Sequence, residues 1–194
     1  MKHTALIALT LILGACTSQL APDGPYQPVS ENLRSALIAE ERNLEAADLI
    51  YTDPVEAKRL LREALTADIY FGPAHNNLGV LYLEQGKLFE AANEFEWARK
   101  LMPGAPDPRM NLALTLEVAG RAEEAIAEYR SALETAPGHV PTMQSLARLL
   151  VAENRSDEQL PLLLKGVALH AIDSNRRRWA LKLLSASRGA DEDR

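Results

Sequence analysis

The feature that most constrains the fold of this chain is an internal repeat of 34 residues. Shifted by one period, the pair Leu78-Gly79 falls on Leu112-Ala113 and then on Leu146-Ala147. Small residues and prolines recur at the same spacing: Ala91 and Ala125; Ala98, Ala132 and Gly166; Pro103 and Pro137. A fixed period of this length is typical of repeat arrays, in which each repeat is one supersecondary unit that packs on its neighbours.

The composition and the positions of glycine, asparagine and proline indicate that each unit consists of two helices. The chain of 194 residues contains 30 Ala and 32 Leu, two of the strongest helix formers, so we expect an all-α protein. Gly86, Gly120 and Asn154 fall where a turn would join the two helices, and Pro103 and Pro137 would end the second helix. Small residues such as Gly79 allow the two helices to cross closely.

The pattern Leu-Gly-x-x-Tyr, then Ala-x-x-x-Phe-x-x-Ala and a closing Pro, resembles the tetratricopeptide repeat, whose period is also 34. The resemblance implies a right-handed superhelical array of helix-turn-helix repeats. Residues 72–105 and 106–139 match nearly throughout, with His75 and Arg109 standing where the family often has Trp.

Two further repeats are less regular. In residues 38–71, which are divergent, Leu44, Ala57, Leu61 and Ala64 fall on the equivalent core positions. Asp53-Pro54 there would be the N-cap and first residue of a helix. Residues 140–173 are degenerate: Gln159 and Ala171 replace the small Ala and the closing Pro.

The end of the array carries its own signals. Pro161 predicts a late start or a kink in the second helix of the last repeat. Residues 174–187 would then form a capping helix, sealed by an apolar face of Trp179, Ala180, Leu183 and Leu184. The repeat domain would span residues 31–188, and residues 189–194 would form a polar tail.

The amino terminus reads as a targeting segment. A positive start, an apolar stretch from Ala5 to Leu13 and small residues after it form a short signal peptide over residues 1–15. The apolar run is about half of the roughly 20 residues that a membrane span needs. Leu13-Gly14-Ala15-Cys16 resembles the lipobox of bacterial lipoproteins, which implies that Cys16 is acylated and becomes the first residue. The alternative is an incidental or buried cysteine behind a generic signal.

Residues 16–30 contain Pro22, Pro25, Pro28 and Gly24 and lack a helical period, so we expect a lipidated cysteine followed by a semi-extended tether. Thr17 follows the cysteine, where an inner-membrane retention signal would usually be Asp. In a Gram-negative host this resemblance implies an outer-membrane lipid anchor with the repeats facing the periplasm.

Several functions are disfavoured by the composition. Loss of residues 1–15 removes Lys2 and no acidic residue, which leaves 20 basic and 27 acidic side chains, a poor balance for nucleic-acid binding. The histidines His3, His75, His139 and His170 are scattered, and no catalytic motif or phosphate-binding loop is present. We therefore expect no metal, no cofactor, no catalytic residues and no enzymatic activity. Arg176-Arg177-Arg178 could recognise an acidic partner or form the polar face of the capping helix.

The family resemblance implies that the first helices line a concave groove. The residues that would face it are Asn76, Val80, Leu83, Met110, Leu114, Glu117, Gln144, Arg148 and Val151. Val80, Leu83, Met110 and Leu114 would form an apolar strip, unless neighbouring helices already cover it. Chaperone-tail-binding members of the family clamp a terminal carboxylate with Lys and Asn; Asn76 could provide one element, but the lysines are absent.

The sequence therefore predicts a non-enzymatic, membrane-anchored scaffold that binds an envelope protein or a peptide segment of one. In organisation it resembles lipoproteins that assist pilus assembly and secretin insertion. A second possibility of the same architecture is an adaptor or regulator of a peptidoglycan hydrolase or protease. A rival from another class is an enzyme, or a subunit that completes an active site.

Overall fold

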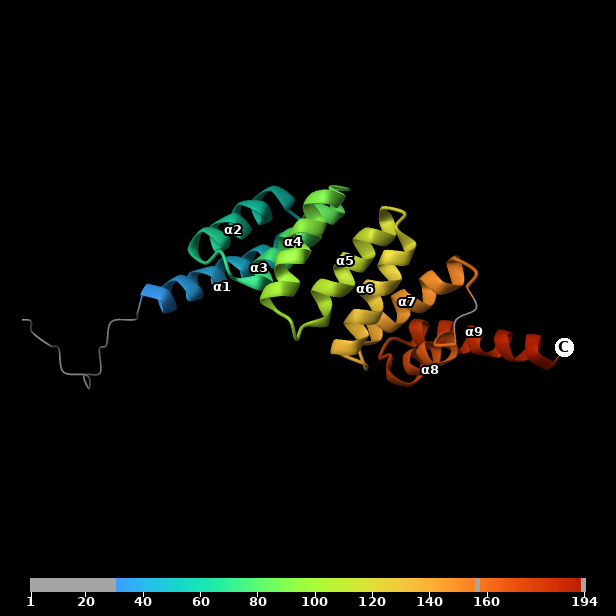
Figure 1. Ribbon diagram of the computed structural model, residues 1–194. Coiled ribbons are helices and arrows are strands. Elements are labelled where there is room, and N and C mark those ends of the chain that lie inside the picture. Colours follow the sequence, from blue (N-terminus) through green and yellow to red (C-terminus); the bar gives the residue numbers. More distant parts are fainter. Residues whose placement is uncertain (1–30, 156–157, 193–194) are drawn as a thin grey trace, which may run out of the picture. The chain divides into compact units, whose positions relative to one another are not determined.

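The structure is a computed structural model that describes residues 31–155 and 158–192 (Figure 1). The predicted signal peptide, Cys16 and the predicted tether lie outside the described residues. Every element in the described part of the chain is a helix. The helices are α1 (Glu31–Leu49), α2 (Pro54–Ala67), α3 (Gly72–Glu84), α4 (Leu88–Leu101), α5 (Pro106–Val118), α6 (Ala122–Thr135), α7 (Val140–Ala152), α8 (Leu160–His170) and α9 (Ser174–Glu192).

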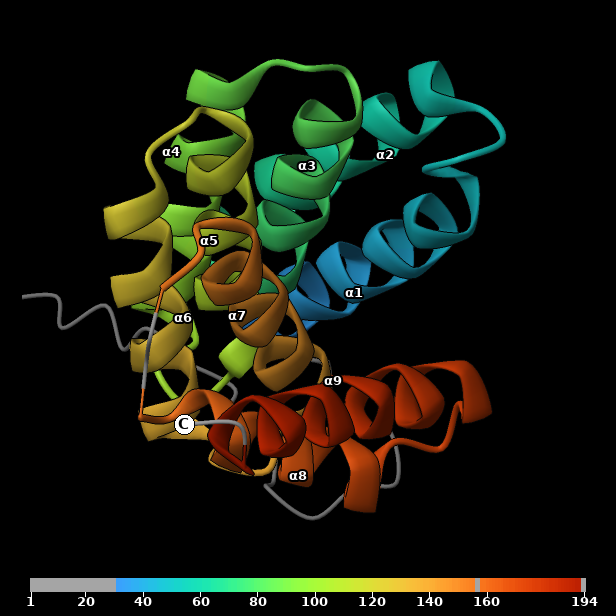
Figure 2. The same ribbon diagram turned by 90° about the vertical axis from the view of Figure 1, so that its right-hand side faces the viewer.

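The helices pack in chain order as a row of pairs. Helices α1 and α2 contact each other, as do α3 and α4, α5 and α6, and α7 and α8, and each second helix contacts the first helix of the next pair. The first helices are also neighbours, because α3 contacts both α1 and α5, and α5 contacts α7 (Figures 1 and 2). The predicted all-α array of helix-turn-helix repeats is confirmed.

Two clusters of apolar side chains form the core. The first joins α1, α2 and α3, and the second extends from α4 to α9. Phe95 and Tyr129, one period apart, are the largest fully buried side chains. Val80 and Tyr82 of α3 pack against both clusters and so connect them. Because large side chains are buried at a fixed period, each pair of helices is stabilised by packing against the neighbouring pair.

The crossing of α3 and α4 requires a small residue, as the sequence indicates. A Cβ atom built on Gly79 would lie 2.6 Å from Cε1 of Phe95, so α3 and α4 approach too closely for a side chain at this position unless the ring moves. A Cβ atom on Gly166 of α8 would meet Sδ of Met143 on α7 at the same distance of 2.6 Å, but the end of the methionine side chain is flexible and can shift away.

The turns and caps also follow the sequence. Gly86, Gly120 and Asn154 have φ values of 70°, 75° and 50°, the left-handed conformation that Gly and Asn tolerate best. Asp53 caps α2, because its carboxylate accepts a hydrogen bond of 3.1 Å from the backbone N–H of Glu56. Helix α8 begins at Leu160, so the late start that Pro161 predicts is confirmed.

The structure corrects the prediction for Leu44. Its equivalents Leu78, Leu112 and Leu146 are buried, but Leu44 is 61% exposed. Leu78 packs among apolar residues of the preceding pair of helices. Among the described residues no repeat precedes α1, so the equivalent position on α1 is left open to solvent.

The boundaries of the terminal helices differ as well. The sequence predicts a cap that ends at 187 and a polar tail over 189–194, but α9 continues to Glu192. A glycine inside a helix costs only about 1 kcal/mol, and no proline follows, so Gly189 alone does not end the helix. The apolar face of the cap is confirmed: Ala180 is buried, and Trp179, Leu183 and Leu184 pack against the core. Within the described part of the chain, no helix has both the length and the apolar character needed to cross a membrane.

Candidate binding face on the first helices

The nine predicted groove residues lie on three neighbouring first helices, α3, α5 and α7, and we call this set the first-helix face. Val80, Leu83 and Met110 are half-buried because they pack against the second core cluster. Leu114 and Gln144 are half-buried, and Val151 is 43% exposed. The apolar strip is therefore partly covered by its own core, and the exposed apolar side chain of the first-helix face is Val151 on α7.

Asparagine side chains connect the first helices to each other. Asn77 Nδ2 on α3 donates a hydrogen bond of 2.9 Å to Asn43 Oδ1 on α1. Asn111 Nδ2 on α5 donates one of 3.0 Å to Asn76 Oδ1 on α3. These amide pairs join α3 to α1 and α5 to α3.

Glu117 makes the corresponding connection between α5 and α7. Its carboxylate accepts hydrogen bonds of 3.0 Å each from the Tyr129 hydroxyl and from the Arg148 guanidinium. Burial, together with the nearby charge and hydrogen bond of Glu117, raises the pKa of Tyr129 far above its ordinary value, so the hydroxyl stays a donor. The predicted groove residues Glu117 and Arg148 thus form an ion pair that spans two repeats.

Asn43, Asn77 and Asn111 were not among the predicted groove residues, although a signal for them was present in the sequence. The three asparagines are spaced by 34 residues and stand at the same position of three successive repeats. Asparagine is unusual inside a helix, because its amide competes for backbone groups. A polar residue that recurs at the repeat period therefore marks a position with a shared role.

His75 occupies a second polar cluster, between α3 and α4. Its Nδ1 lies 2.6 Å from Glu94 Oε2, its Nε2 lies 2.9 Å from the carbonyl oxygen of Ile69, and its ring stacks on Trp97. Burial opposes the charged form, but the carboxylate and the carbonyl outweigh it and raise the pKa of His75. The residue that stands in place of the usual Trp is thus a structural histidine.

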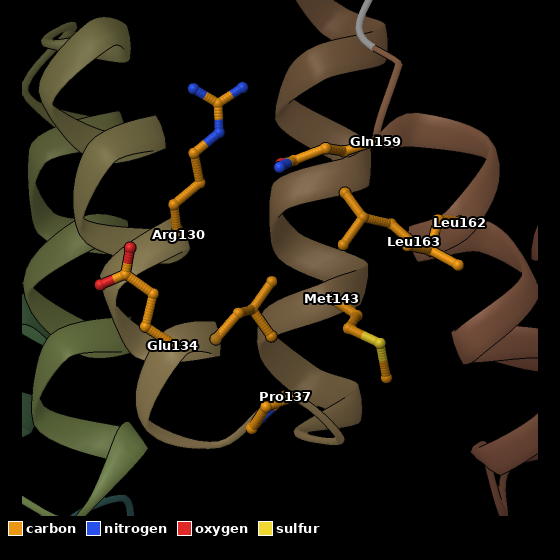
Figure 3. Close-up of a pocket in the computed structure, with 8 residues that line it drawn as sticks. Arg130, Glu134, Pro137, Met143, Gln159, Leu162 and Leu163 are labelled. Carbon is orange, nitrogen blue, oxygen red and sulfur yellow. The ribbon is translucent and has the colours of Figure 1, made fainter.

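A pocket of about 330 Å³ lies between α6, α7 and α8 (Figure 3). The apolar residues that line it are Leu133, Pro137, Met143, Leu162 and Leu163, and the polar ones are Arg130, Glu134 and Gln159. It is largely apolar and none of the predicted groove residues lines it. In the described part of the chain, no group of three or more His, Cys, Asp or Glu side chains could hold a metal ion.

The comparisons with known proteins agree with this fold. Residues 76–140 match the family model described as tetratricopeptide repeat. No curated protein matches the chain. Together, the family match over residues 76–140, the repeated geometry and the similar solved structures support a tetratricopeptide-repeat fold for this array of helices.

Three solved structures illustrate the similarity. A tetratricopeptide repeat protein from Parabacteroides merdae is 22% identical, with a TM-score of 0.63 over 79% of this chain and 61% of that one. The Thermobaculum terrenum O-GlcNAc transferase is 24% identical, with a TM-score of 0.64 over 71% of this chain. This chain spans only 27% of the transferase. The first tetratricopeptide domain of Spaghetti, bound to an HSP90 peptide, is 18% identical, with a TM-score of 0.57 over 61% of this chain and 95% of that domain.

Proposed function

We propose that this protein is a non-enzymatic, membrane-anchored scaffold that binds an extended segment of a cell-envelope protein along its first-helix face. The observation that carries the proposal is the pair of asparagines Asn77 and Asn111, which stand one repeat period apart and directly follow Asn76 and Met110 of this face. Each amide offers two N–H donors and one carbonyl acceptor. The hydrogen bond to Asn43 uses one N–H of Asn77, and that to Asn76 uses one N–H of Asn111, so each keeps donor and acceptor capacity among the described residues.

Such amides suit the backbone of a peptide, which carries one donor and one acceptor at each residue. Asn77 and Asn111 are half-buried, so their amides are partly shielded from water and already held in place. A preorganised donor loses less conformational freedom when a ligand binds. Leu114, one turn after Asn111 on α5, and the exposed Val151 on α7 offer apolar contacts that would recognise a side chain of the segment.

The structural neighbours support this mode of binding at the level of the fold. The Spaghetti domain binds an HSP90 peptide, and we propose that this chain also binds a segment of a partner protein. The lysines of a carboxylate clamp are absent from the first-helix face, so we propose an internal extended segment rather than a terminal one. The proposal excludes catalysis by this chain, although one structural neighbour is a glycosyltransferase.

The proposed membrane anchor and cellular location are based on the sequence of residues 1–30. The signal peptide over 1–15 and the lipobox-like sequence before Cys16 support an acyl anchor in the outer membrane, with the array in the periplasm. Two or three acyl chains hold a protein stably where one would not. Assembly of a pilus or a secretion system is the proposed setting, because lipoproteins of that kind share this organisation.

Two variants test the binding face. Leu114→Glu combined with Val151→Glu places two charges on the first-helix face. We expect at least about a tenfold loss of partner binding, because a bound segment would bury these charges without a counter-charge. The matched control is Val55→Glu with Phe89→Glu, which places the same charges on two side chains that are 80% and 76% exposed elsewhere. Equal binding by both variants would refute the proposed face.

The anchor is tested separately. Cys16→Ser should abolish the incorporation of labelled fatty acid and release the chain from the membrane fraction. Lipid labelling that persists in this variant would refute the anchor and leave the binding face unaffected.

A further inference from the structure

The first and the last helix of the array each expose a face that the proposed function does not use. Leu37 and Leu44 of α1 are 52% and 61% exposed. They are two helical turns apart and share one face, nearly opposite the buried Ala39 and Ala46, through which α1 packs on the array. Helix α1 is therefore apolar on two sides, and only one of them is covered by this chain.

The exposed face of α1 is acidic. Glu40 and Asp48 lie one turn before and one turn after Leu44, and both are exposed. The whole helix carries five acidic and two basic side chains. Of the two basic residues, Arg42 forms ion pairs with Glu45 and Glu63 and with neither Glu40 nor Asp48, and Arg34 lies near the start of the helix, six residues before Glu40.

The exposed face of α9 has the opposite charge. Leu181 is 53% exposed, and Arg178 and Lys182 lie beside it, three residues before and one residue after. Arg178 and Lys182 lie nearly opposite Ala180, which is fully buried against the core, and Leu181 lies about 100° around the helix from it. Residues 174–186 carry four basic and no acidic side chains, and Arg178 and Lys182 form no ion pair with the described residues.

We propose that these two faces bind each other between copies of this chain, so that α1 of one molecule packs against α9 of the next. In this pairing Leu181 of one copy lies between Leu37 and Leu44 of the other, and Arg178 and Lys182 lie near Glu40 and Asp48. Pairing of α1 with α1 would bring acid against acid, and pairing of α9 with α9 would bring base against base. Charge therefore selects the head-to-tail contact.

A head-to-tail contact has a structural consequence. Each copy carries both faces, so the contact is heterologous and produces open chains or closed rings rather than a limited dimer. A single pair of helices buries less than the roughly 1,200 Å² of a standard interface, so the association is weak and depends on concentration. Because exposed charges contribute to it, salt weakens it.

Light scattering on the full chain tests the contact, with the same non-ionic detergent in every sample so that the micelle mass is constant. We expect the mass of the wild-type chain to increase with protein concentration, up to about 1 mM, at low salt. At about 0.5 M NaCl it should return to one chain per particle. A wild-type chain that remains monomeric at all concentrations at low salt would overturn the proposal.

Charge reversal makes the test specific. One variant carries Glu40→Lys and Asp48→Lys, and a second carries Arg178→Glu and Lys182→Glu. Alone, each presents like charges at the contact, so its dissociation constant should increase about tenfold or more. Mixed in equal amounts, the two variants restore opposite charges at every contact, and the association should return.

The control variant carries Glu90→Lys and Glu134→Lys, which changes the net charge as much as the α1 variant but alters exposed acids on α4 and α6. It should associate like the wild type. If each end variant associates alone as well as the wild type does, or if the mixture stays monomeric, the head-to-tail contact is refuted.

Discussion

The close crossing of α3 and α4 gives a prediction whose magnitude follows from the structure. In Gly79→Ala the new methyl carbon would lie 2.6 Å from Cε1 and 2.7 Å from Cδ1 of Phe95. These distances are about 1 Å shorter than the best separation of two carbon atoms. Phe95 is fully buried, so its ring can move only by displacing the side chains packed around it, or else the two helices separate.

Overpacking of this kind costs about 1–3 kcal/mol, and alanine recovers about 1 kcal/mol because it favours the helix more than glycine does. We expect a net loss of up to about 2 kcal/mol in the free energy of unfolding. At roughly 2–4 °C for each kcal/mol, the midpoint of thermal unfolding should decrease by up to several degrees. Urea and thermal unfolding followed by circular dichroism measure both quantities.

Gly138→Ala is the matched control, because a Cβ atom on Gly138 would have no neighbour within 4 Å. That variant should be neutral or slightly stabilised. Phe95→Leu should reduce the cost of Gly79→Ala when the two are combined, since the smaller side chain relieves the contact. If Gly79→Ala is as stable as Gly138→Ala, the close crossing is not a constraint and the reasoning is wrong.

Three further predictions concern polar side chains. The pKa of His75 is raised in the folded state, so protonation of this side chain stabilises the fold. The stabilisation is complete below pH 6.5, the ordinary pKa of histidine, and is lost as the pH rises through the folded pKa. The urea midpoints at pH 6 and pH 8 should therefore differ less in His75→Phe than in the wild type. Tyr129→Phe leaves Glu117 without one donor and should cost about 1–2 kcal/mol in urea unfolding, whereas an unchanged midpoint would refute that role. Asp53→Ala removes the cap of α2 and should cost about 1 kcal/mol, and a variant as stable as the wild type would show that the cap contributes nothing.

Much of the fold was predictable because residues of the same type recur at equivalent positions of several repeats. The period of 34 places the close approaches at Gly79 and Gly166 and the inter-helix turns at Gly86 and Gly120, where the structure has them. These positions are set by local backbone conformation or by close contact within one repeat. Each of these favours a small residue, which can be recognised in the sequence.

The prediction failed where the repeat ends. Leu44 matches the pattern but is exposed, because burial at that position requires a preceding repeat. The same limit applies to the cap, since nothing in the periodic pattern determines where a terminal helix stops.

The binding face was predictable as a set of positions but not as a set of contacts. Sequence spacing placed Val80, Leu83 and Met110 on one face, but it could not show that the core partly covers them. It also gave no sign that Glu117 would pair with both Tyr129 and Arg148, because those contacts join residues 12 and 31 positions apart.

The central claim, that a partner binds along the first-helix face, is tested most directly by site-specific photo-crosslinking of the full chain in its own cells. A photoreactive residue at Leu114 should give a discrete adduct with one envelope protein, and the same residue at the exposed Val55 should not. Peptide mapping of the adduct should place the crosslink in an internal segment of that protein. Identical adducts from both positions, or none from Leu114, would contradict the account.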